Sequence, residues 1–157
     1  MNLLYLIITA VAIGIDQLTK YLLYGQSFAV IGDFLWVESS FNTGAAFSIM
    51  SGAKWFFIVV SSLASVMMIY FILTKHFKMT KFTKICLAMI AGGALGNLID
   101  RIWLGGVRDF IYFKSLNFAI FNIADSFVTI GCIMLIVAFI VSFFKTYKKG
   151  DNNGTQD

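Results

Sequence analysis

Hydrophobic residues gather in four long runs along this chain, separated by shorter polar segments. The runs cover about 3–24, 55–74, 85–104 and 123–144. A helix of ~20 apolar residues is long enough to cross the ~30 Å hydrocarbon core of a bilayer. The pattern therefore predicts a single polytopic membrane domain over residues 1–157. The first run is too long for a cleaved signal peptide and lacks a basic stretch before it, so we expect it to be retained as a span.

Two longer connections, at about 25–54 and 105–122, are unusually apolar for loops. Aromatic and β-branched residues, which favour strands, are concentrated in Phe28–Val37, Val107–Phe113 and Phe118–Phe121. We expect a small β-sheet on the membrane surface there; the alternative is a pair of irregular loops that dip into the headgroups. The predicted fold class is a mostly α membrane protein, a four-transmembrane-helix bundle with a small extracytoplasmic β-sheet.

A hairpin between two of these stretches would bring two acids together. With a turn around Ser115–Leu116, Asp109 faces Asn122. Asparagine is a favoured helix N-cap, and Asp125 follows Asn122 by about one helical turn. The assumed register therefore places Asp109 near Asp125 at the outer mouth of the bundle.

Composition supports a membrane location. Hydrophobic residues make up 59% of the chain, charged residues 13%, and the mean hydropathy is +0.85. Soluble domains carry about twice that share of charge. In a soluble protein the net charge of +4 would suggest a nucleic-acid partner, but here the positions of the lysines explain the excess, and we expect no such partner. Cys86 and Cys132 lie inside apolar runs, without the spacing of a metal or redox motif.

The basic residues predict the orientation in the membrane. Segment 74–84 and the tail after residue 144 together hold seven lysines, against four basic residues near the opposite side. Cytoplasmic flanks of membrane helices carry the excess of lysine and arginine. We therefore expect both termini in the cytoplasm and the two longer connections outside. The polar stretch 151–157 is expected to be disordered.

Ionisable side chains within membrane spans mark either a function or a buried pair. Asp16 and Lys20 are four residues apart, which favours an ion pair within the first helix. Asn97, Asp100 and Arg101 crowd the outer end of the third span, where interfacial anchoring is an equally good explanation. These positions are polar support or site residues; the spacing alone does not decide between the two.

Several other kinds of site can be weighed by counting. The one histidine, His76, lies in the basic cytoplasmic segment, which argues against zinc sites and histidine-dependent triads. A Ser–Lys peptidase stays open, because Lys20, Lys54 and Lys114 are available, although no serine is clearly placed to pair with them. A non-enzymatic tetraspan transporter or lipid-binding protein also stays open, although a transporter would distribute polar groups to the midplane. We expect no metal and no cofactor.

Five motifs resemble those of the lipoprotein signal peptidase (signal peptidase II) family, in order along nearly the whole chain. One such motif alone would carry little weight, but five at fitting spacing are highly specific. They are Asp16-Gln17-Leu18-Thr19-Lys20, Asn42-Thr43-Gly44-Ala45-Ala46-Phe47-Ser48, the stretch from Gly93 to Arg101, Val107-Arg108-Asp109-Phe110, and Phe121-Asn122-Ile123-Ala124-Asp125-Ser126.

The chain departs from the family pattern in two places. Arg108 stands where the family often carries an apolar residue, and the chain lacks the proline that is common between the two aspartates. Side chains alternate along a strand, so Arg108 should point away from the face of Asp109. We therefore expect its effect on the acids to be small.

The resemblance implies a membrane aspartic endopeptidase that removes signal peptides from diacylglyceryl-modified prolipoproteins, cutting just before the lipidated cysteine. Its partners would be these lipid-modified precursors and membrane lipids. It would lie in the bacterial cell membrane with its active site near the extracytoplasmic surface; the oligomeric state is open, with a monomer favoured. The implied catalytic residues are Asp109 and Asp125, the implied site-lining residues are Asn42, Asn97, Arg101 and Asn122, and the implied structural support is Asp16, Lys20 and Asp100.

Within the implied site, Asn122 would orient an aspartate, and Asn97 and Arg101 would hold the substrate backbone. Ionising both of two neighbouring carboxylates is unfavourable because the two negative charges repel, so we expect them to share one proton near neutral pH. The ionised acid would take a proton from water, and the protonated acid would donate to the scissile carbonyl. The sequence does not assign the proton to either aspartate.

Overall fold

The computed structural model of the chain describes residues 2–44 and 50–153, with side chains described up to residue 144. Four helices carry most of the chain: α1 (Leu3–Leu23), α2 (Lys54–Leu73), α3 (Lys81–Trp103) and α4 (Ile123–Asn153). Each is long and apolar enough to span a bilayer, α4 through its segment Ile123–Phe144. Together with the sheet described below, they confirm the predicted fold class.

Two helices extend beyond the apolar runs that predicted them. α3 begins at Lys81 because the hydroxyl of Thr80 accepts a hydrogen bond from the N–H of Thr83, which caps the helix before its apolar run starts. α4 continues to Asn153. The expectation of disorder at 151–157 is therefore wrong for residues 151–153, while residues 154–157 lie outside the described part of the chain.

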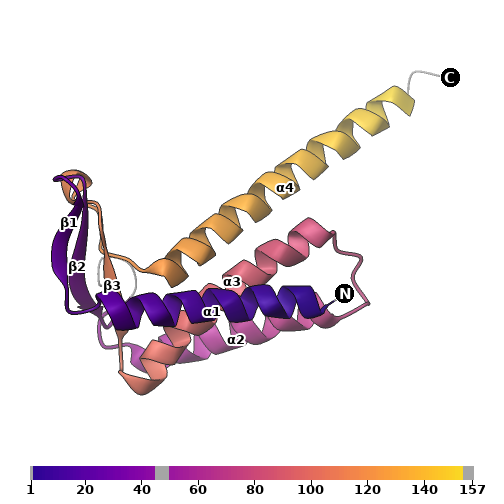
Figure 1. Cartoon of the computed structure of the whole chain (residues 1–157). Coiled ribbons are helices and arrows are strands. Elements are labelled where there is room, and N and C mark those ends of the chain that lie inside the picture. Colours follow the sequence, from indigo (N-terminus) through magenta and orange to yellow (C-terminus); the bar gives the residue numbers. More distant parts are fainter. Residues whose placement is uncertain (1, 45–49, 154–157) are drawn as a thin grey trace.

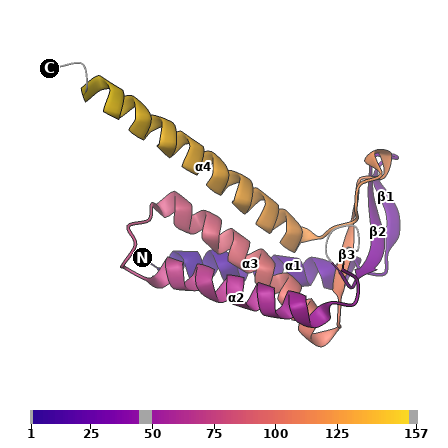
Figure 2. The ribbon, with the colours of Figure 1, turned by 180° about the vertical axis from the view of Figure 1, so that it is seen from behind.

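α3 is the central helix of the bundle and packs against each of the other three. Its small residues permit close packing. A Cβ atom on Gly92 would lie 2.6 Å from Cβ of Ala12, and one on Gly96 would lie 2.5 Å from Oδ2 of Asp16, both on α1. Figures 1 and 2 show α1, α2 and α3 side by side, while α4 starts beside α3 and diverges from it with distance from the sheet.

Three antiparallel strands form the sheet, in the order β1 (Ser27–Ile31), β2 (Leu35–Asn42), β3 (Val107–Tyr112). The sheet lies at one end of the bundle, opposite the N-terminus and the connection between α2 and α3 (Figure 1). The stretch 28–37, expected to be one β-prone segment, is divided between β1 and β2. Gly32, with a φ of 45°, allows the tight turn that separates them.

The hairpin predicted from the sequence is wrong in its extent and its register. Phe121 forms a single isolated bridge, with Ile111, where the predicted register would have paired Ile111 with Ile120. The connection tightens into a 3-10 turn at Lys114–Leu116, followed by Asn117 in the left-handed region with a φ of 45°. This turn shifts the pairing by one residue and leaves the segment before α4 too irregular to continue the sheet.

Candidate active site

α4 begins with two reciprocal hydrogen bonds between Asn122 and Asp125. The N–H of Asp125 donates to Oδ1 of Asn122 at 2.9 Å, and the N–H of Asn122 donates to Oδ2 of Asp125 at 3.2 Å. This capping box satisfies two of the backbone donors that the first turn of a helix leaves free. The expectation that Asn122 caps the fourth helix is confirmed. The cap also fixes the Asp125 carboxylate at the start of α4.

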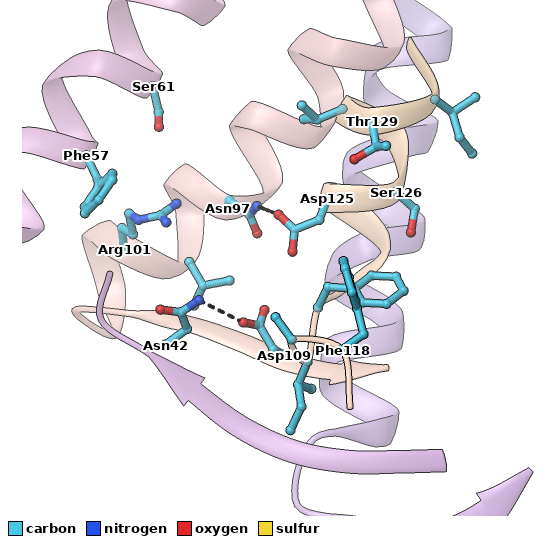
Figure 3. A pocket seen from close by; sticks show the side chains of 16 residues that line it. Asn42, Phe57, Ser61, Asn97, Arg101, Asp109, Phe118, Asp125, Ser126 and Thr129 are labelled. Carbon is cyan, nitrogen blue, oxygen red and sulfur yellow. Dashed lines mark hydrogen bonds between the residues drawn. The ribbon is translucent and has the colours of Figure 1, made fainter. Parts of the chain in front are cut away.

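Asp109 lies on β3 with its side chain 2% exposed. The pairing of β2 with β3 places Ser40 opposite Asp109 and Asn42 opposite Val107. Two amides donate to the Asp109 carboxylate, Nδ2 of Asn42 to Oδ2 at 3.2 Å (Figure 3) and Nδ2 of Asn122 to Oδ1 at 2.6 Å. Asn122 therefore reaches Asp109 through its side chain, although the strand register that predicted their meeting does not form.

Asn97 connects the two acids from α3. Its Nδ2 donates to Oδ1 of Asp125 at 2.8 Å, and its Oδ1 accepts from Nδ2 of Asn122 at 3.1 Å. Because Asn122 also contacts Asp109, two asparagines link the two carboxylates. Figure 3 shows the carboxylates entering one pocket from β3 and from α4. Asp109 and Asp125 are called the acid pair below.

The surroundings of Asp109 favour its protonated form. Burial, followed by the charge of Asp125, raises the pKa of Asp109 from its ordinary value of 3.8 to about 7. The amides of Asn42 and Asn122 and the charge of Lys20 act in the opposite direction and do not cancel this rise. A carboxyl with such a pKa, beside a second carboxylate, can hold a shared proton near neutral pH, which acid–base catalysis by two acids requires.

The acid pair faces a pocket of about 600 Å³. Arg101 lines it from α3; its Nη2 donates to the carbonyl oxygen of Gly44 at 3.1 Å, and its guanidinium lies 5.0 Å from the ring centroid of Phe57. The pocket continues from the acids into the space between α2 and α4. The lining residues on these two helices are Phe57, Ser61, Asp125, Ser126, Val128, Thr129 and Ile130.

Behind the acid pair, α1 and α3 hold a set of buried charges. Lys20 pairs with Asp16 at 2.8 Å, as the spacing of four residues predicted, and both side chains are fully buried. Nζ of Lys20 also lies 3.6 Å from Oδ2 of Asp100 and donates to Oδ1 of Asn97 at 2.9 Å. Oδ1 of Asp16 accepts the N–H of Ala124 at 2.9 Å. These charges therefore support the acid pair twice, through Asn97 and through the first turn of α4.

Sequence reasoning did not predict two residues that bond to these charges, Gln17 and Arg108. Nη2 of Arg108 donates to Oδ1 of Asp100 at 2.8 Å and to Oε1 of Gln17 at 3.1 Å, and Nε2 of Gln17 donates to Oδ1 of Asp100 at 3.2 Å. The bonds to Asp100 raise the pKa of Arg108 above its ordinary value. The available signal was a buried aspartate near the end of a span, which needs a cation. The ion cluster consists of Asp16, Gln17, Lys20, Asp100 and Arg108.

The structure brings the residues singled out by the sequence to one end of the bundle. Asn42, Asn97, Arg101 and the acid pair line the pocket. Asn122 is fully buried and contacts both acids. Asp100, for which interfacial anchoring was an open alternative, is instead 1% exposed and belongs to the ion cluster. The motif residues Ala45–Ser48 lie outside the described residues.

Comparison with known proteins identifies related sequences over most of the chain. A family model described as signal peptidase (SPase) II matches residues 8–141. The lipoprotein signal peptidase of Bacillus pumilus (strain SAFR-032) is 39% identical over 149 residues, which cover 90% of this chain and 96% of that protein. The lipoprotein signal peptidase of Enterococcus faecalis (strain ATCC 700802 / V583) is 37% identical over 153 residues, covering 94% of each.

Solved structures with the same fold include two described as bacterial membrane enzyme structures obtained by the in meso method. The one at 2.3 Å resolution is 37% identical in sequence, has a TM-score of 0.81, and the match covers 88% of both chains. The one at 1.9 Å resolution is 38% identical and has a TM-score of 0.76, over 86% of this chain and 91% of the other. The likeness therefore extends over most of the chain.

Proposed function

The chain belongs to the signal peptidase II family of membrane aspartic peptidases, which cleave signal peptides from prolipoproteins, and from this premise we propose that Asp109 and Asp125 are its catalytic residues. The protein is a multi-pass membrane protein with four spans. One observation carries the proposal: two carboxylates from separate elements face one pocket and are joined by two asparagines. An acid pair in such a pocket supports hydrolysis by activated water.

In the resting enzyme, Asp109 holds the proton that the acid pair shares. Asp109 is the more deeply buried acid, and its pKa is raised to about 7. Asp125 lies in the first turn of α4 and accepts hydrogen bonds from the N–H of Asn122 and from Nδ2 of Asn97. These contacts hold the Asp125 carboxylate at a fixed place beside Asp109.

Hydrolysis then follows with a balanced exchange of protons. Asp125 takes a proton from a water molecule, whose oxygen attacks the scissile carbonyl carbon, while Asp109 donates its proton to the carbonyl oxygen. When the tetrahedral intermediate collapses, one of its hydroxyls returns a proton to Asp109, and Asp125 protonates the leaving amine. Both acids end in their starting states.

The pocket suits a substrate that arrives within the membrane. Apolar side chains, among them Phe57, Val128 and Ile130, line its extension between α2 and α4 together with three hydroxyl side chains. This lining fits an apolar signal helix and a diacylglyceryl chain. Arg101 and Asn97 hold the substrate backbone at the acids. The cut falls just before the lipid-modified cysteine, which the lipid keeps at the membrane surface.

The active site lies near the extracytoplasmic surface, and both termini lie in the cytoplasm. The sheet, which carries Asp109, and the start of α4, which carries Asp125, are at the end of the bundle opposite the lysine-rich connection of α2 to α3 (Figure 2). Every residue of β1 is exposed, including Phe28, Val30 and Ile31, so this strand can rest on the bilayer. One copy of the chain supplies both acids, so we expect a monomer to be active.

The test is cleavage of a purified, lipidated prolipoprotein by the full chain in lipid vesicles. Asp109→Asn and Asp125→Asn, each made alone, should abolish release of the signal peptide while leaving insertion and folding intact. Asp33→Asn is the matched control, because the Asp33 side chain is 85% exposed and away from the pocket, and it should cleave at the parental rate. Cleavage by either acid-pair variant at near the parental rate would refute the assignment.

A further inference from the structure

Arg108 fastens strand β3 to helix α3 at the residue next to Asp109. Its backbone N–H and its Nε donate to Oδ2 of Asp100 at 3.0 and 3.1 Å, and its Nη2 donates to Oδ1 at 2.8 Å. One carboxylate thus holds the main chain and the side chain of the same residue. Asp100 is 1% exposed, so water competes little for these bonds.

The attachment fixes the strand on the face opposite the acid. Side chains alternate along a strand, so neighbouring residues point to opposite faces. Arg108 is held on one face by Asp100, and Asp109 is held on the other by Asn42 and Asn122. A strand that cannot shift or rotate on one face presents the carboxylate on its other face at a fixed place.

Arg108 also balances the charge of the ion cluster. The cluster contains two aspartates and two cations, and Lys20 lies 2.8 Å from Asp16 but 3.6 Å from Asp100. Arg108, at 2.8 Å, is therefore the nearer cation of Asp100. Without it, two buried carboxylates would share one lysine, and Lys20 would be drawn toward Asp100.

A displacement of Lys20 would reach the acid pair. Nζ of Lys20 donates to Oδ1 of Asn97, and Nδ2 of Asn97 donates to Asp125. The same Oδ1 accepts from Asn122, the residue that contacts Asp109. Each contact in this path is a direct hydrogen bond between buried or part-buried groups, so a shift at one end has few ways to be absorbed.

We propose that Arg108 is a positioning residue of the catalytic site, which acts on Asp109 through its contact with Asp100. This inference rests on the proposed catalytic role of the acid pair. It replaces the sequence-based expectation that Arg108 has little effect because it points away from the acids. A positioning residue affects the transition state more than the binding of substrate, so its loss lowers kcat while KM changes little.

The charge of Arg108 gives this role a second readout. The charge of Lys20 lowers the pKa of Asp109. Loss of Arg108 draws Lys20 toward Asp100 and leaves a buried negative charge less balanced, so the apparent pKa values that limit the pH profile of cleavage rise. A role in folding alone would lower the amount of active enzyme without moving that profile. Several charged and titratable groups face Arg108 and the acid pair. They are Asp16 and Lys20 on α1, Tyr24 just after α1, Asp100 and Arg101 on α3, and the two acids themselves on β3 and α4.

The experiment compares Arg108→Met and Arg108→Lys in the full chain, in vesicles, with a lipidated prolipoprotein as substrate. Arg108→Met should lower kcat about 10- to 100-fold, with KM within about threefold of the parent, and should shift the pH profile upward. Arg108→Lys keeps a cation beside Asp100; it should recover most of kcat and restore the parental profile. Lys114→Met, which removes a part-exposed cation paired with the exposed Asp33, is the matched control and should leave kcat and the profile unchanged.

Three results would overturn the inference: parental kcat in Arg108→Met, a loss confined to KM, or a lower kcat with an unshifted pH profile. If Arg108→Met is not recovered in folded form, Arg108→Gln takes its place, because glutamine can still donate to Asp100 without a charge. Asp109→Asn is assayed alongside. An inactive Asp109→Asn with a fully active Arg108→Met would refute this inference alone, whereas an active Asp109→Asn would refute the proposed function.

Discussion

The ion cluster and the acid pair each contain two buried or half-buried aspartates, but their surroundings differ. In the ion cluster each aspartate contacts a cation at 2.8 Å. The acid pair accepts hydrogen bonds from amides and from a backbone N–H, and no salt bridge reaches it within residues 2–44 and 50–144. One group of carboxylates is thus neutralised by charge, and the other is stabilised by neutral donors.

This difference would allow one small bundle to contain both structural acids and the proposed catalytic acids. A carboxylate bonded directly to a cation is held in an ion pair, and that contact occupies its oxygens. A buried carboxyl that meets only neutral donors and another acid keeps a proton and can exchange it near neutral pH. The environment, rather than the residue type, therefore separates the aspartates of the ion cluster from the two acids proposed as catalytic.

The largest expected contrast is between activity and stability in the acid pair. Asp109→Asn should lower cleavage about 10³-fold or more, since the amide cannot transfer the proton. Its unfolding temperature should stay at or above that of the parent, because the substitution replaces a buried acid by a neutral group that still hydrogen-bonds. Cleavage activity and the unfolding temperature, measured on one preparation, test the two expectations. A clear fall in the unfolding temperature would mean that Asp109 is structural.

The ion cluster should show the opposite response. Lys20→Met leaves two buried carboxylates with too few cations and should destabilise the protein by about 3–5 kcal/mol. Lys114→Met removes the exposed pair with Asp33 and should cost about 1 kcal/mol or less. Denaturant titration of the purified proteins in mild detergent gives both values. An equal loss of unfolding free energy in the two variants would show that the ion cluster stabilises the fold no more than an exposed ion pair does.

A smaller effect is expected where α3 approaches the ion cluster. In Gly96→Ala the new Cβ would meet Oδ2 of Asp16 at 2.5 Å, which should cost about 1–3 kcal/mol as the helices move apart. Gly14→Ala, on α1, meets nothing within 4 Å and should be neutral or slightly stabilising. The unfolding temperatures of the two variants are compared. A Gly96→Ala variant as stable as Gly14→Ala would argue against close packing of α3 on α1 at this position.

A pH dependence of stability that belongs to Asp109 is a separate expectation. Its pKa is raised to about 7 in the folded protein from an ordinary value of 3.8. Between these values the unfolded chain releases a proton that the folded protein keeps, so the contribution of Asp109 to stability falls as pH rises from about 4 to about 7. Asp109→Asn should remove this component. Unfolding free energies at pH 4.5 and 7 in parent and variant give the difference, and an identical slope in both would contradict it.

The sequence predicted the features that depend on local pattern. Apolar runs of helix-spanning length gave the four spans, and the spacing of four residues gave the pair of Asp16 with Lys20. The asparagine and aspartate at the start of the last run gave the cap of α4. Each of these rests on residues within one helical turn or one continuous segment, where periodicity and capping preferences are informative.

The sequence did not predict contacts between remote segments. Asn42 meets Asp109 because β2 pairs with β3, two strands separated by a whole transmembrane helix pair. The predicted hairpin failed because a 3-10 turn absorbed an extra residue, and a shift of one residue changes every pairing that follows. The bond of Arg108 to Asp100 also joins two different elements, β3 and α3. The periodicity of a helix or a strand predicts contacts only within that element.

The hydrogen bond from the Ala124 N–H to the Asp16 carboxylate joins the first turn of α4 to α1. During synthesis the ribosome delivers α1 to the membrane well before α4. Asp16 can therefore pair with Lys20 at once, but it accepts the hydrogen bond from Ala124 only after α4 has been inserted and packs against α1. Since Asp125 lies on that same helix, the acid pair proposed as catalytic is complete only after the last span has been inserted.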